Sequence, residues 1–239
     1  MALTRESFNQ IAPSWYKLRH RSRFRRELTR LAGQWQKGRL LNIGCAHGPD
    51  FLPFNAGFEL YGLDFSREMI RLAAEYAAKE NFQADLVVAD AAYLPFAART
   101  FDWAISVATY HHLHYPQERR AAFHELWRVL KPGGEAFITV WNRWQPRFWF
   151  KGKEIIVPWH SRGTAWPRYH YLFSYRELES EARQAGFTVL GSSPEDSYRF
   201  PLKYFSRNIC LLVRKGSPAP VASATEENQA IPGEKSDKN

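Results

Sequence analysis

The sequence predicts an α/β fold in which a doubly wound, mainly parallel sheet has helices on both of its faces. Stretches with the two-residue period of strands alternate along the chain with stretches that have the period of helices. A glycine-containing turn, GCAHG at residues 44–48, directly follows the first strand pattern. At 239 residues, of which 45% are hydrophobic, the chain is long enough to bury a core as one domain. Because strands joined through helices normally lie parallel with right-handed crossovers, the alternation favours the doubly wound arrangement.

The individual elements follow from local patterns. One strand is expected to end at Asp64, and further strand patterns occupy residues 39–44, 85–90, 101–108, 135–141, 187–192 and 207–215. Helix patterns occupy residues 66–80, 116–134 and 174–186. Ser66 is a typical N-cap, Pro116 suits a first helical turn, and glycines are expected to end the second and third helices.

Three segments differ in composition from the alternating core. Residues 142–173 interleave Trp, Phe and Tyr with Arg, Lys and His, and we expect this insertion to cover the site rather than form another strand and helix. Residues 1–37 are expected to be a basic helical segment that precedes the main domain at residues 38–215. Residues 216–239 contain no aromatic residue and are largely Gly, Ser, Pro, Ala and charged residues, which predicts a disordered tail.

Positive charge is concentrated near the N-terminus. Residues 1–40 hold ten basic side chains against Glu6 and Glu27, a local charge of +8 within a formal +9 for the chain. Such a cluster attracts polyanions at long range, although a solvated helix face is an equally ordinary explanation. With two cysteines, no apolar signal sequence and no run of about 18 apolar residues, we expect a soluble cytoplasmic protein without a membrane contact or a metal site.

A ligand is expected beyond the carboxyl ends of the strands, where doubly wound sheets bind their ligands. Gly44 and Gly48 allow a close approach to the backbone, and Pro49 suits the start of a helix whose N-terminus favours an anion. Asp64 can accept both hydroxyls of a ribose, with a solvated turn carboxylate as the ordinary alternative. NAD is therefore one candidate, but the full G-x-G-x-x-G fingerprint is absent.

Four stretches within residues 38–141 carry a resemblance to one family. They are LNIGCAHG, YGLDFS, VVADAAYLPFAARTFDWAISVATYHHL and LWRVLKPGGEAFITVW, in this order. They resemble the successive motifs of the class I S-adenosylmethionine-dependent methyltransferases. The resemblance implies a Rossmann-like fold with a seven-stranded sheet and S-adenosyl-L-methionine as the cofactor.

The resemblance also implies which residues bind the cofactor. The glycine turn would hold the methionine part and Asp64 the ribose, while Asp90 with Ala91 would contact the adenine; a helix N-cap is the alternative for Asp90. The end of the fourth strand would line the sulfonium. The implied set is Asn42, Gly44, Cys45, Ala46, Gly48, Asp64, Phe65, Asp90, Ala91 and Val107.

Two positions depart from the family pattern, which usually has an acid where Asn42 stands and a glycine where Ala46 stands. Asparagine keeps hydrogen-bonding capacity but lacks the charge that would attract the cofactor's ammonium group. Alanine costs about 1 kcal/mol if its position needs a positive φ, and nothing otherwise. We therefore expect weakened rather than abolished cofactor binding. We expect His47 in the same turn to be an exposed loop residue.

A narrower resemblance reaches from about residue 8 to residue 215. FNQIAPSWYKLR, the Ala108 to His112 stretch, IIVPWH, RYHYLFSYREL and SRNICLLVRK resemble motifs of the tRNA wobble-uridine methyltransferases, which esterify 5-carboxymethyluridine. The chain departs from these motifs at Leu18, at the order of His170 and Tyr171, and at Ile209. The resemblance implies a tRNA anticodon loop as substrate and an N-terminal segment that binds it. The candidate catalytic residues are Arg19, His111, His112, Arg168 and Asn208.

Such a reaction needs positioning more than a general base. A carboxymethyl group has an ordinary pKa of about 4 and is ionised at neutral pH, whereas in-line placement is worth up to about 7 to 11 kcal/mol. Arg19 and Arg168 could hold the carboxylate or flanking phosphates, and His112 could orient the uracil or a carboxylate oxygen. Arg19 could equally belong to a solvated face. His111 and His112 could instead be one buried, backbone-bonded histidine and one solvent-facing neighbour.

Partners and competing functions complete the expectations. Eukaryotic and archaeal members of the family work with a small zinc-binding activator subunit, which implies such a partner at the edge strand, Asp85 to Asp90. A small-molecule methyltransferase, acting for example on a quinone precursor, is the main alternative. A catalytically silent binding module is another, which Asn42 and Ala46 would favour. The basic N-terminus and the basic aromatic insertion favour single-stranded RNA over a small molecule.

Overall fold

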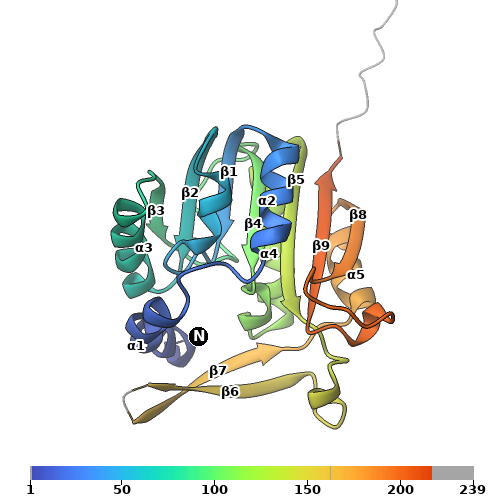
Figure 1. Ribbon diagram of the computed structural model, residues 1–239. Coiled ribbons are helices and arrows are strands. Elements are labelled where there is room, and N and C mark those ends of the chain that lie inside the picture. The colour runs from blue at the N-terminus through green and yellow to red at the C-terminus, as the bar shows by residue number, and fades with distance from the viewer. Residues whose placement is uncertain (1, 162, 217–239) are drawn as a thin grey trace, which may run out of the picture.

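The computed structural model describes residues 2–161 and 163–216, and Figure 1 shows their arrangement. A seven-stranded sheet lies at the centre, and a two-stranded sheet lies below it in this view. The large sheet consists of β1 (Gly38–Ile43), β2 (Phe58–Asp64), β3 (Asp85–Val88), β4 (Phe101–Val107), β5 (Leu130–Trp141), β8 (Phe187–Pro194) and β9 (Asn208–Lys215). The small sheet consists of β6 (Glu154–Ser161) and β7 (Thr164–Tyr171). The α-helices are α1 (Ala2–Leu18), α2 (Arg25–Trp35), α3 (Arg67–Lys79), α4 (Pro116–Val129) and α5 (Tyr175–Gln184), and the 3-10 helices are η1 (Pro49–Phe54), η2 (Tyr110–His112), η3 (Pro146–Phe148) and η4 (Lys203–Phe205).

The strand order of the large sheet is β3-β2-β1-β4-β5-β9-β8. The first five strands of the chain pair in parallel, and β9 runs antiparallel to both of its neighbours. This order confirms the predicted doubly wound, mainly parallel, seven-stranded sheet. Because the chain order reverses between β1 and β4, the carboxyl ends of these strands form the crevice in which such folds bind ligands.

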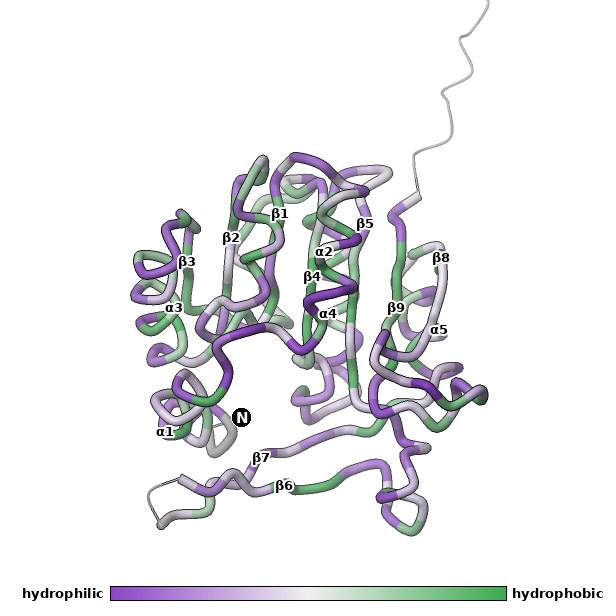
Figure 2. The backbone as a smooth tube through the Cα atoms, in the orientation of Figure 1, coloured by the Kyte–Doolittle hydropathy of each residue, from purple (hydrophilic) through white to green (hydrophobic). Residues whose placement is uncertain are grey.

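Alternate residues of the strands face two separate cores. Leu40 packs with residues of α2, η1 and α3, whereas Leu41 packs with residues of α4 and α5 on the opposite face. In β4, Ile105 belongs to the same core as Leu40, and Ala104 belongs to the same core as Leu41. Figure 2 shows the hydrophobic character of the central strands. Both faces of the sheet are therefore covered, as expected for a parallel sheet.

The junction between α4 and β5 differs from the prediction. The helix ends at Val129 and the strand begins at the next residue, so residues 133–134 lie inside the strand and not at a helix end. The register between β4 and β5 shifts near this point. Gly133 has a φ of +80°, and a Cβ on Gly134 would lie 2.8 Å from the carbonyl oxygen of Asp102. The two glycines permit an irregular start of the strand that a larger residue would block.

The insertion at residues 142–173 contains the β6-β7 hairpin, which the sequence did not predict as strands. The hairpin packs against α1. The indole N–H of Trp159 donates a hydrogen bond to the Ser14 hydroxyl at 2.8 Å, and the rings of Trp15 and Trp159 lie 4.9 Å apart. α1 also contacts α3. The N-terminal helix and the hairpin together lie below the sheet in Figure 1.

The edges of the domain follow the prediction in part. β3 is an edge strand, and in the described part of the chain it pairs with β2 alone. It ends at Val88 rather than Asp90, which forms an isolated bridge with Tyr93. The predicted tail, apart from Gly216, lies outside the described residues. Within those residues, no helix combines the length and the apolar character needed to cross a bilayer.

Candidate active site

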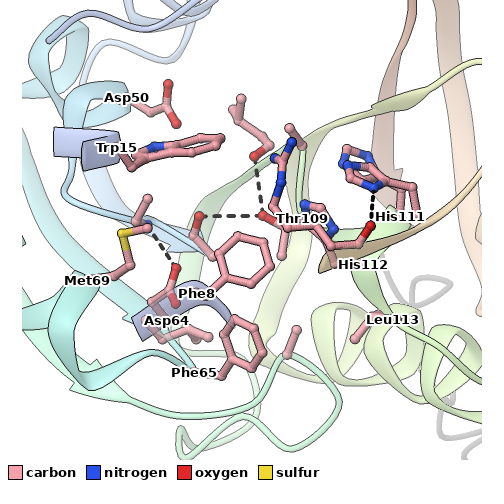
Figure 3. A pocket seen from close by; sticks show the side chains of 18 of the residues that line it. Phe8, Trp15, Asp50, Asp64, Phe65, Met69, Thr109, His111, His112 and Leu113 are labelled. Carbon is pink, nitrogen blue, oxygen red and sulfur yellow. Dashed lines mark hydrogen bonds between the residues drawn. The ribbon is translucent and has the colours of Figure 1, made fainter. Parts of the chain in front are cut away.

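One cavity lies at the crevice between the ends of β1 and β4 and extends under α1 and β7. It brings together all five candidate catalytic residues, Arg19, His111, His112, Arg168 and Asn208. Seven of the predicted cofactor-binding residues also line it, namely Gly44, Ala46, Asp64, Phe65, Asp90, Ala91 and Val107. Asn42, Cys45 and Gly48 do not. Figure 3 shows Asp50, Asp64 and the two neighbouring histidines in the wall of this cavity.

The glycine turn after β1 has a left-handed backbone at three positions. Gly44, Ala46 and Gly48 have φ values of +71°, +48° and +91°. A Cβ on Gly44 would lie 2.2 Å from Oγ1 of Thr109, so only glycine fits there. Ala46 does need a positive φ. It therefore carries the strain of about 1 kcal/mol that we expected only if this position required such a backbone conformation.

Asp64 ends β2 and is held by the glycine turn and by the start of α3. Its two carboxylate oxygens accept the backbone N–H groups of Ala46 and Ser66, at 3.0 and 2.9 Å. The residue is only 6% exposed, which excludes a solvated turn carboxylate. Burial raises the pKa of Asp64 to about 6, although the two hydrogen bonds act in the opposite direction. Each oxygen can still accept a second hydrogen bond from a ligand in the cavity.

Asn42 lies in β1 behind the cavity wall. It is completely buried, and in the described part of the chain neither its Nδ2 nor its Oδ1 has a hydrogen-bond partner. A buried amide without partners costs about 1–3 kcal/mol. Asn42 therefore presents neither a charge nor a polar atom to the cavity.

Asp90 and its neighbours form another part of the wall. Oδ1 of Asp90 accepts the N–H of Ala92 at 2.9 Å, so Asp90 caps a turn and not a helix. Ala91 and Val107 line the same cavity, and the ring of Phe65 lies 5.4 Å from that of Phe8. This region combines apolar side chains with one carboxylate, which suits a purine that carries an exocyclic amine.

Asp50 was not predicted as a site residue. It lies in η1, a six-residue 3-10 helix that begins at Pro49, where the sequence predicted the start of a helix. The side chain is 7% exposed and lines the cavity. Burial raises the pKa of Asp50 to about 6. The sequence signal for this residue was an acid placed two positions after the last glycine of the turn.

Two guanidinium groups converge on Trp15. Cζ of Arg19 lies 5.3 Å from the centroid of the Trp15 ring, and Cζ of Arg168 lies 5.7 Å from it. Arg168 is 7% exposed, and its Nε lacks a hydrogen-bond partner among the described residues. Burial and then the charge of Arg19 lower the pKa of Arg168 to about 10, and burial also lowers the pKa of Arg19. Arg19 is thus not part of a solvated face.

The two arginines lack acidic partners. Within residues 2–161 and 163–216, neither Arg19 nor Arg168 forms an ion pair with a carboxylate. Two like charges that are partly removed from water repel each other, and an anion placed between them would relieve this cost. The arrangement therefore favours an anionic ligand at this end of the cavity.

His47 is buried, which corrects the expectation of an exposed loop residue. It is 0% exposed, and its ring lies 5.2 Å from Tyr16 and 5.3 Å from Tyr76. Its Nε2 lies 2.8 Å from the carbonyl oxygen of Arg19 and must donate, because a carbonyl only accepts. The expectation failed because the segment between α1 and α2, which Figure 2 shows as hydrophilic, folds over the turn. His47 thereby positions the backbone that carries Arg19.

His112 and His170 contribute two hydrogen-bond acceptors to the cavity. Their Nδ1 atoms lie 2.8 and 3.0 Å from the carbonyl oxygens of Tyr169 and Arg168. Each Nδ1 therefore carries the proton, and each Nε2 keeps a free lone pair. Burial lowers the pKa of His112 to about 4 and that of His170 to about 2, so both rings are neutral at pH 7. His170 was not predicted as a site residue, because its position beside His112 depends on the packing of β7 against η2.

His111 has the opposite tautomer. Its Nδ1 accepts the backbone N–H of Trp141 at 3.2 Å, so its Nε2 carries the proton and can donate. His111 is buried, and His112 lines the cavity with its Nδ1 bonded to the backbone, which argues against the alternative of a solvent-facing neighbour. One nitrogen from each of the three rings lies within 4.8 Å of the others, a spacing that could hold a metal ion. However, the one lone pair of the neutral His111 ring, on Nδ1, already accepts the N–H of Trp141, so His111 has none left for a metal. The cluster therefore offers one donor and two acceptors to a polar ligand.

Asn208 reaches the cavity through the pairing of β5 with β9. It lies opposite Trp141, whose ring stacks on His170 with 4.1 Å between the centroids. The backbone N–H of Asn208 donates to Oε2 of Glu195 at 2.8 Å. This pairing places Asn208 beside Trp141, in the wall of the cavity that also contains the histidine cluster.

Comparison with known proteins agrees with this architecture. Residues 40–134 match a family model described as a methyltransferase domain. Together with the strand order and the glycine turn, the match shows that the chain carries a class I S-adenosylmethionine-dependent methyltransferase domain. The cofactor of this domain is S-adenosylmethionine.

Within that class, the chain is similar to proteins named as tRNA methyltransferases. A probable tRNA methyltransferase 9B from Homo sapiens is 29% identical over 178 residues, which cover 74% of this chain and 36% of that protein. A tRNA (carboxymethyluridine(34)-5-O)-methyltransferase from Arabidopsis thaliana is 37% identical over 102 residues, which cover 43% of this chain and 24% of that protein. The chain thus spans about a third and about a quarter of the length of these two relatives.

A solved structure shows the same fold. It is a complex between the Haloferax volcanii Trm112 methyltransferase activator and a putative methyltransferase, and the match has a TM-score of 0.61 at 17% identity. The match covers 90% of this chain and 98% of that chain. At this identity the likeness concerns the fold alone.

The residues of the cavity fit S-adenosylmethionine. Asp64 has acceptor positions left for two ribose hydroxyls, and the region around Phe65 and Asp90 suits an adenine. Gly44 brings backbone close to the cavity without a side chain. The two buried carboxylates, Asp50 and Asp64, match a ligand that carries positive charge.

Proposed function

We propose that the domain methylates tRNA and that the methyl acceptor is the carboxylate of a 5-carboxymethyl group on a wobble uridine. The observation that carries this proposal is the pair of guanidinium groups of Arg19 and Arg168 around Trp15, without acidic partners in the described part of the chain. A carboxylate between them would form charge-assisted, bidentate hydrogen bonds. The names of the two curated relatives support tRNA as substrate, and one of them names carboxymethyluridine 34.

The chemistry proposed for this site requires little besides placement. When bound, S-adenosylmethionine supplies an electrophilic methyl group on its sulfonium. A carboxylate is already ionised at pH 7, so no side chain needs to remove a proton from it. Arg19 and Arg168 would hold the acceptor oxygen in line, which is worth up to about 7 to 11 kcal/mol. Asp64 would hold the ribose of the cofactor, and Asp90 with Ala91 the adenine.

The histidine cluster suits a uracil ring. The N3–H of uracil needs an acceptor, which the free Nε2 of His112 or His170 provides. A uracil carbonyl needs a donor, and Nε2 of His111 provides one. Neutral cytosine has no proton on N3, so the same cluster would discriminate against it.

Aromatic and basic side chains near the cavity suit a single-stranded RNA loop. Trp149 and Phe150 of the insertion are 51% and 100% exposed. Cζ of Arg147 lies 4.7 Å from the ring of Trp141, a residue that lines the cavity. Exposed rings can stack on splayed bases while arginines contact phosphates. In this proposal, residues 1–37 and 142–173 bind the anticodon loop.

Transfer assays on synthetic anticodon stem-loops test the proposed acceptor. Three stem-loops would carry 5-carboxymethyluridine, uridine or cytidine at the wobble position, with labelled S-adenosylmethionine as donor. We expect label only in the first, in a form released by mild base as an ester. Equal labelling of all three, or none with RNA but transfer to a small acid, would contradict the proposal and favour the small-molecule alternative. Absence of cofactor binding at millimolar concentration would instead favour a silent binding module.

A small activator subunit that adds a strand to β3 forms part of the proposal. β3 is an edge strand, and Val88 at its end is 43% exposed. An uncovered apolar edge is a hazard for aggregation, and a partner strand would remove it. Val88→Glu should abolish the complex with a zinc-binding activator and leave S-adenosylmethionine binding by the chain unchanged. A purified chain that is fully active as a monomer would contradict this part.

A further inference from the structure

We infer that Asp50 binds the positively charged ammonium group of S-adenosylmethionine and takes the place of the acid that position 42 lacks. The inference concerns the cofactor and is independent of the methyl acceptor. Four observations support it: the environment of Asp50, the bonding of the other carboxylates in the cavity, the position of Asn42, and the pairing of nearby arginines.

The environment of Asp50 isolates its charge. The residue is 7% exposed and faces the cavity from η1. The Ser22 hydroxyl is the neighbour that favours the ionised form, and burial outweighs it, because the pKa of Asp50 rises to about 6. Burying an ionised carboxylate without a cation costs free energy. A ligand that brings a cation to Asp50 would offset this cost and would therefore bind more tightly.

The other carboxylates that line the cavity already hold backbone N–H groups. Asp64 accepts two such bonds, Asp90 accepts one from Ala92, and Oε2 of Glu118 accepts the N–H of His114 at 3.1 Å. In the described part of the chain, the donor to the side chain of Asp50 is the Ser22 hydroxyl, and no backbone N–H donates to it. Asp50 therefore keeps as much acceptor capacity as Asp90, and unlike Asp90 it is buried.

Asn42 cannot perform the same task. Its amide is neutral and fully buried, and it does not line the cavity. Asp50 lies on the other side of the same glycine turn, eight positions along the chain. Cys45, in the middle of the turn, is close enough to both acids to be affected by their charges. Burial raises the pKa of its thiol most, and the charges of Asp64 and Asp50 raise it further. The two carboxylates thus flank the turn that is expected to hold the methionine part.

Nearby arginines do not neutralise Asp50. Arg21 and Arg23 also line the cavity. Arg21 pairs with Glu80 at 3.4 Å, and neither arginine lowers the pKa of Asp50. The compensating cation must therefore come from the ligand. Of the charged groups in S-adenosylmethionine, the ammonium is the one with N–H donors that a carboxylate can accept.

Calorimetry with three ligands tests this assignment without any RNA. S-adenosylmethionine carries both the ammonium and the sulfonium, S-adenosylhomocysteine carries the ammonium alone, and 5′-methylthioadenosine carries neither. For Asp50→Asn we expect about 10- to 100-fold weaker binding of the first two ligands, the range of a lost hydrogen bond to a charged group, and unchanged binding of the third. Glu118→Gln is the matched control, because it removes a charge from the same wall while its amide oxygen can still accept, and it should bind all three ligands like the wild type.

Each other pattern overturns the inference. Equal weakening of all three ligands would show a structural role for Asp50, and no weakening would show that the ammonium binds elsewhere. Loss confined to S-adenosylmethionine would assign the charge to the sulfonium. If the proposal for the methyl acceptor is wrong, the result differs: the three ligand affinities stay as expected, while methyl transfer to the stem-loop is absent.

Discussion

The backbone N–H of Ala46 donates a hydrogen bond to Oδ2 of Asp64 at 3.0 Å. Eighteen positions separate these residues in the sequence, and the bond joins the glycine turn after β1 to the end of β2. Ala46 makes it from a left-handed conformation with a φ of +48°. The orientation of Asp64 therefore depends on a residue that is itself strained.

Ala46→Gly should stabilise the domain. Glycine adopts a positive φ without the clash of a Cβ, so the free energy of unfolding should rise by about 1 kcal/mol. Urea denaturation followed by circular dichroism measures this change. Ala73→Gly, in the middle of α3, is the control and should lower the free energy of unfolding by about 1 kcal/mol. A loss of stability in Ala46→Gly would mean that the turn does not need this backbone conformation.

Asp64→Ala should weaken the binding of S-adenosylmethionine at least about 10-fold, because two hydroxyl acceptors and the anchor of the turn are lost. Asp64→Asn, which keeps the shape and one acceptor oxygen, should lose less. Calorimetry of both variants gives the comparison. Cofactor affinity that stays at the wild-type value in Asp64→Ala would place the ribose elsewhere.

Arg19→Ala should leave cofactor binding unchanged and lower the rate of methyl transfer by at least about 10-fold, because it removes one half of the guanidinium pair around Trp15. Arg168→Gln should behave in the same way. Arg26→Ala, on the exposed surface of α2, is the matched control and should keep most of the activity. If Arg19→Ala lost cofactor affinity but Asp64→Ala did not, the assignments of the cofactor site and the acceptor site would have to be exchanged.

Acid should destabilise the domain below about pH 6.5. His47, His112 and His170 have lowered pKa values of about 4, 4 and 2, whereas in the unfolded chain each titrates near 6.5. As the pH falls from 6.5 towards 4, the unfolded state binds protons that the folded state does not, so this contribution to stability is lost. Asp50 and Asp64 act in the opposite direction, because their pKa values are raised to about 6 and the folded state binds their protons first. The histidines are more numerous and should dominate.

His170→Asn tests the contribution of the cluster. The free energy of unfolding, measured by urea denaturation at pH 7.5, 6.5, 5.5 and 4.5, should fall less steeply in this variant than in the wild type. The difference should amount to about 3 kcal/mol between pH 6.5 and pH 4.5, since each pH unit is worth about 1.4 kcal/mol per proton. His124→Asn, at an exposed position of α4, should keep the wild-type slope. An identical slope in His170→Asn would show that this ring takes up its proton at the same pH in the folded and in the unfolded state.

Sequence periodicity predicted the large sheet because each of its strands is apolar and is followed by a helix or turn with its own signals. The β6-β7 hairpin lacked such signals. Pro158 and Pro167 lie opposite each other in it, and proline within an apolar run argues against a strand. The hairpin tolerates both because its strands have no further neighbours in the described part of the chain.

The candidate site was predictable where local sequence determines it. The glycine turn and Asp64 belong to one short loop and the following strand, and Arg19 and His112 belong to recognisable motifs. The burial of His47, by contrast, depends on the segment between α1 and α2 folding over the turn, and the same segment supplies the Ser22 hydroxyl that bonds Asp50. These are tertiary effects, and no local pattern encodes them.

The contact between Trp159 and Ser14 joins residues 145 positions apart. During synthesis, α1 leaves the ribosome long before the hairpin exists, and a domain generally folds as a unit. Trp15 and Arg168 can meet only after residue 168 has emerged, and the last strand of the large sheet, β9, ends at Lys215. In a nascent chain, α1 therefore remains without the hairpin until nearly the whole domain has been translated.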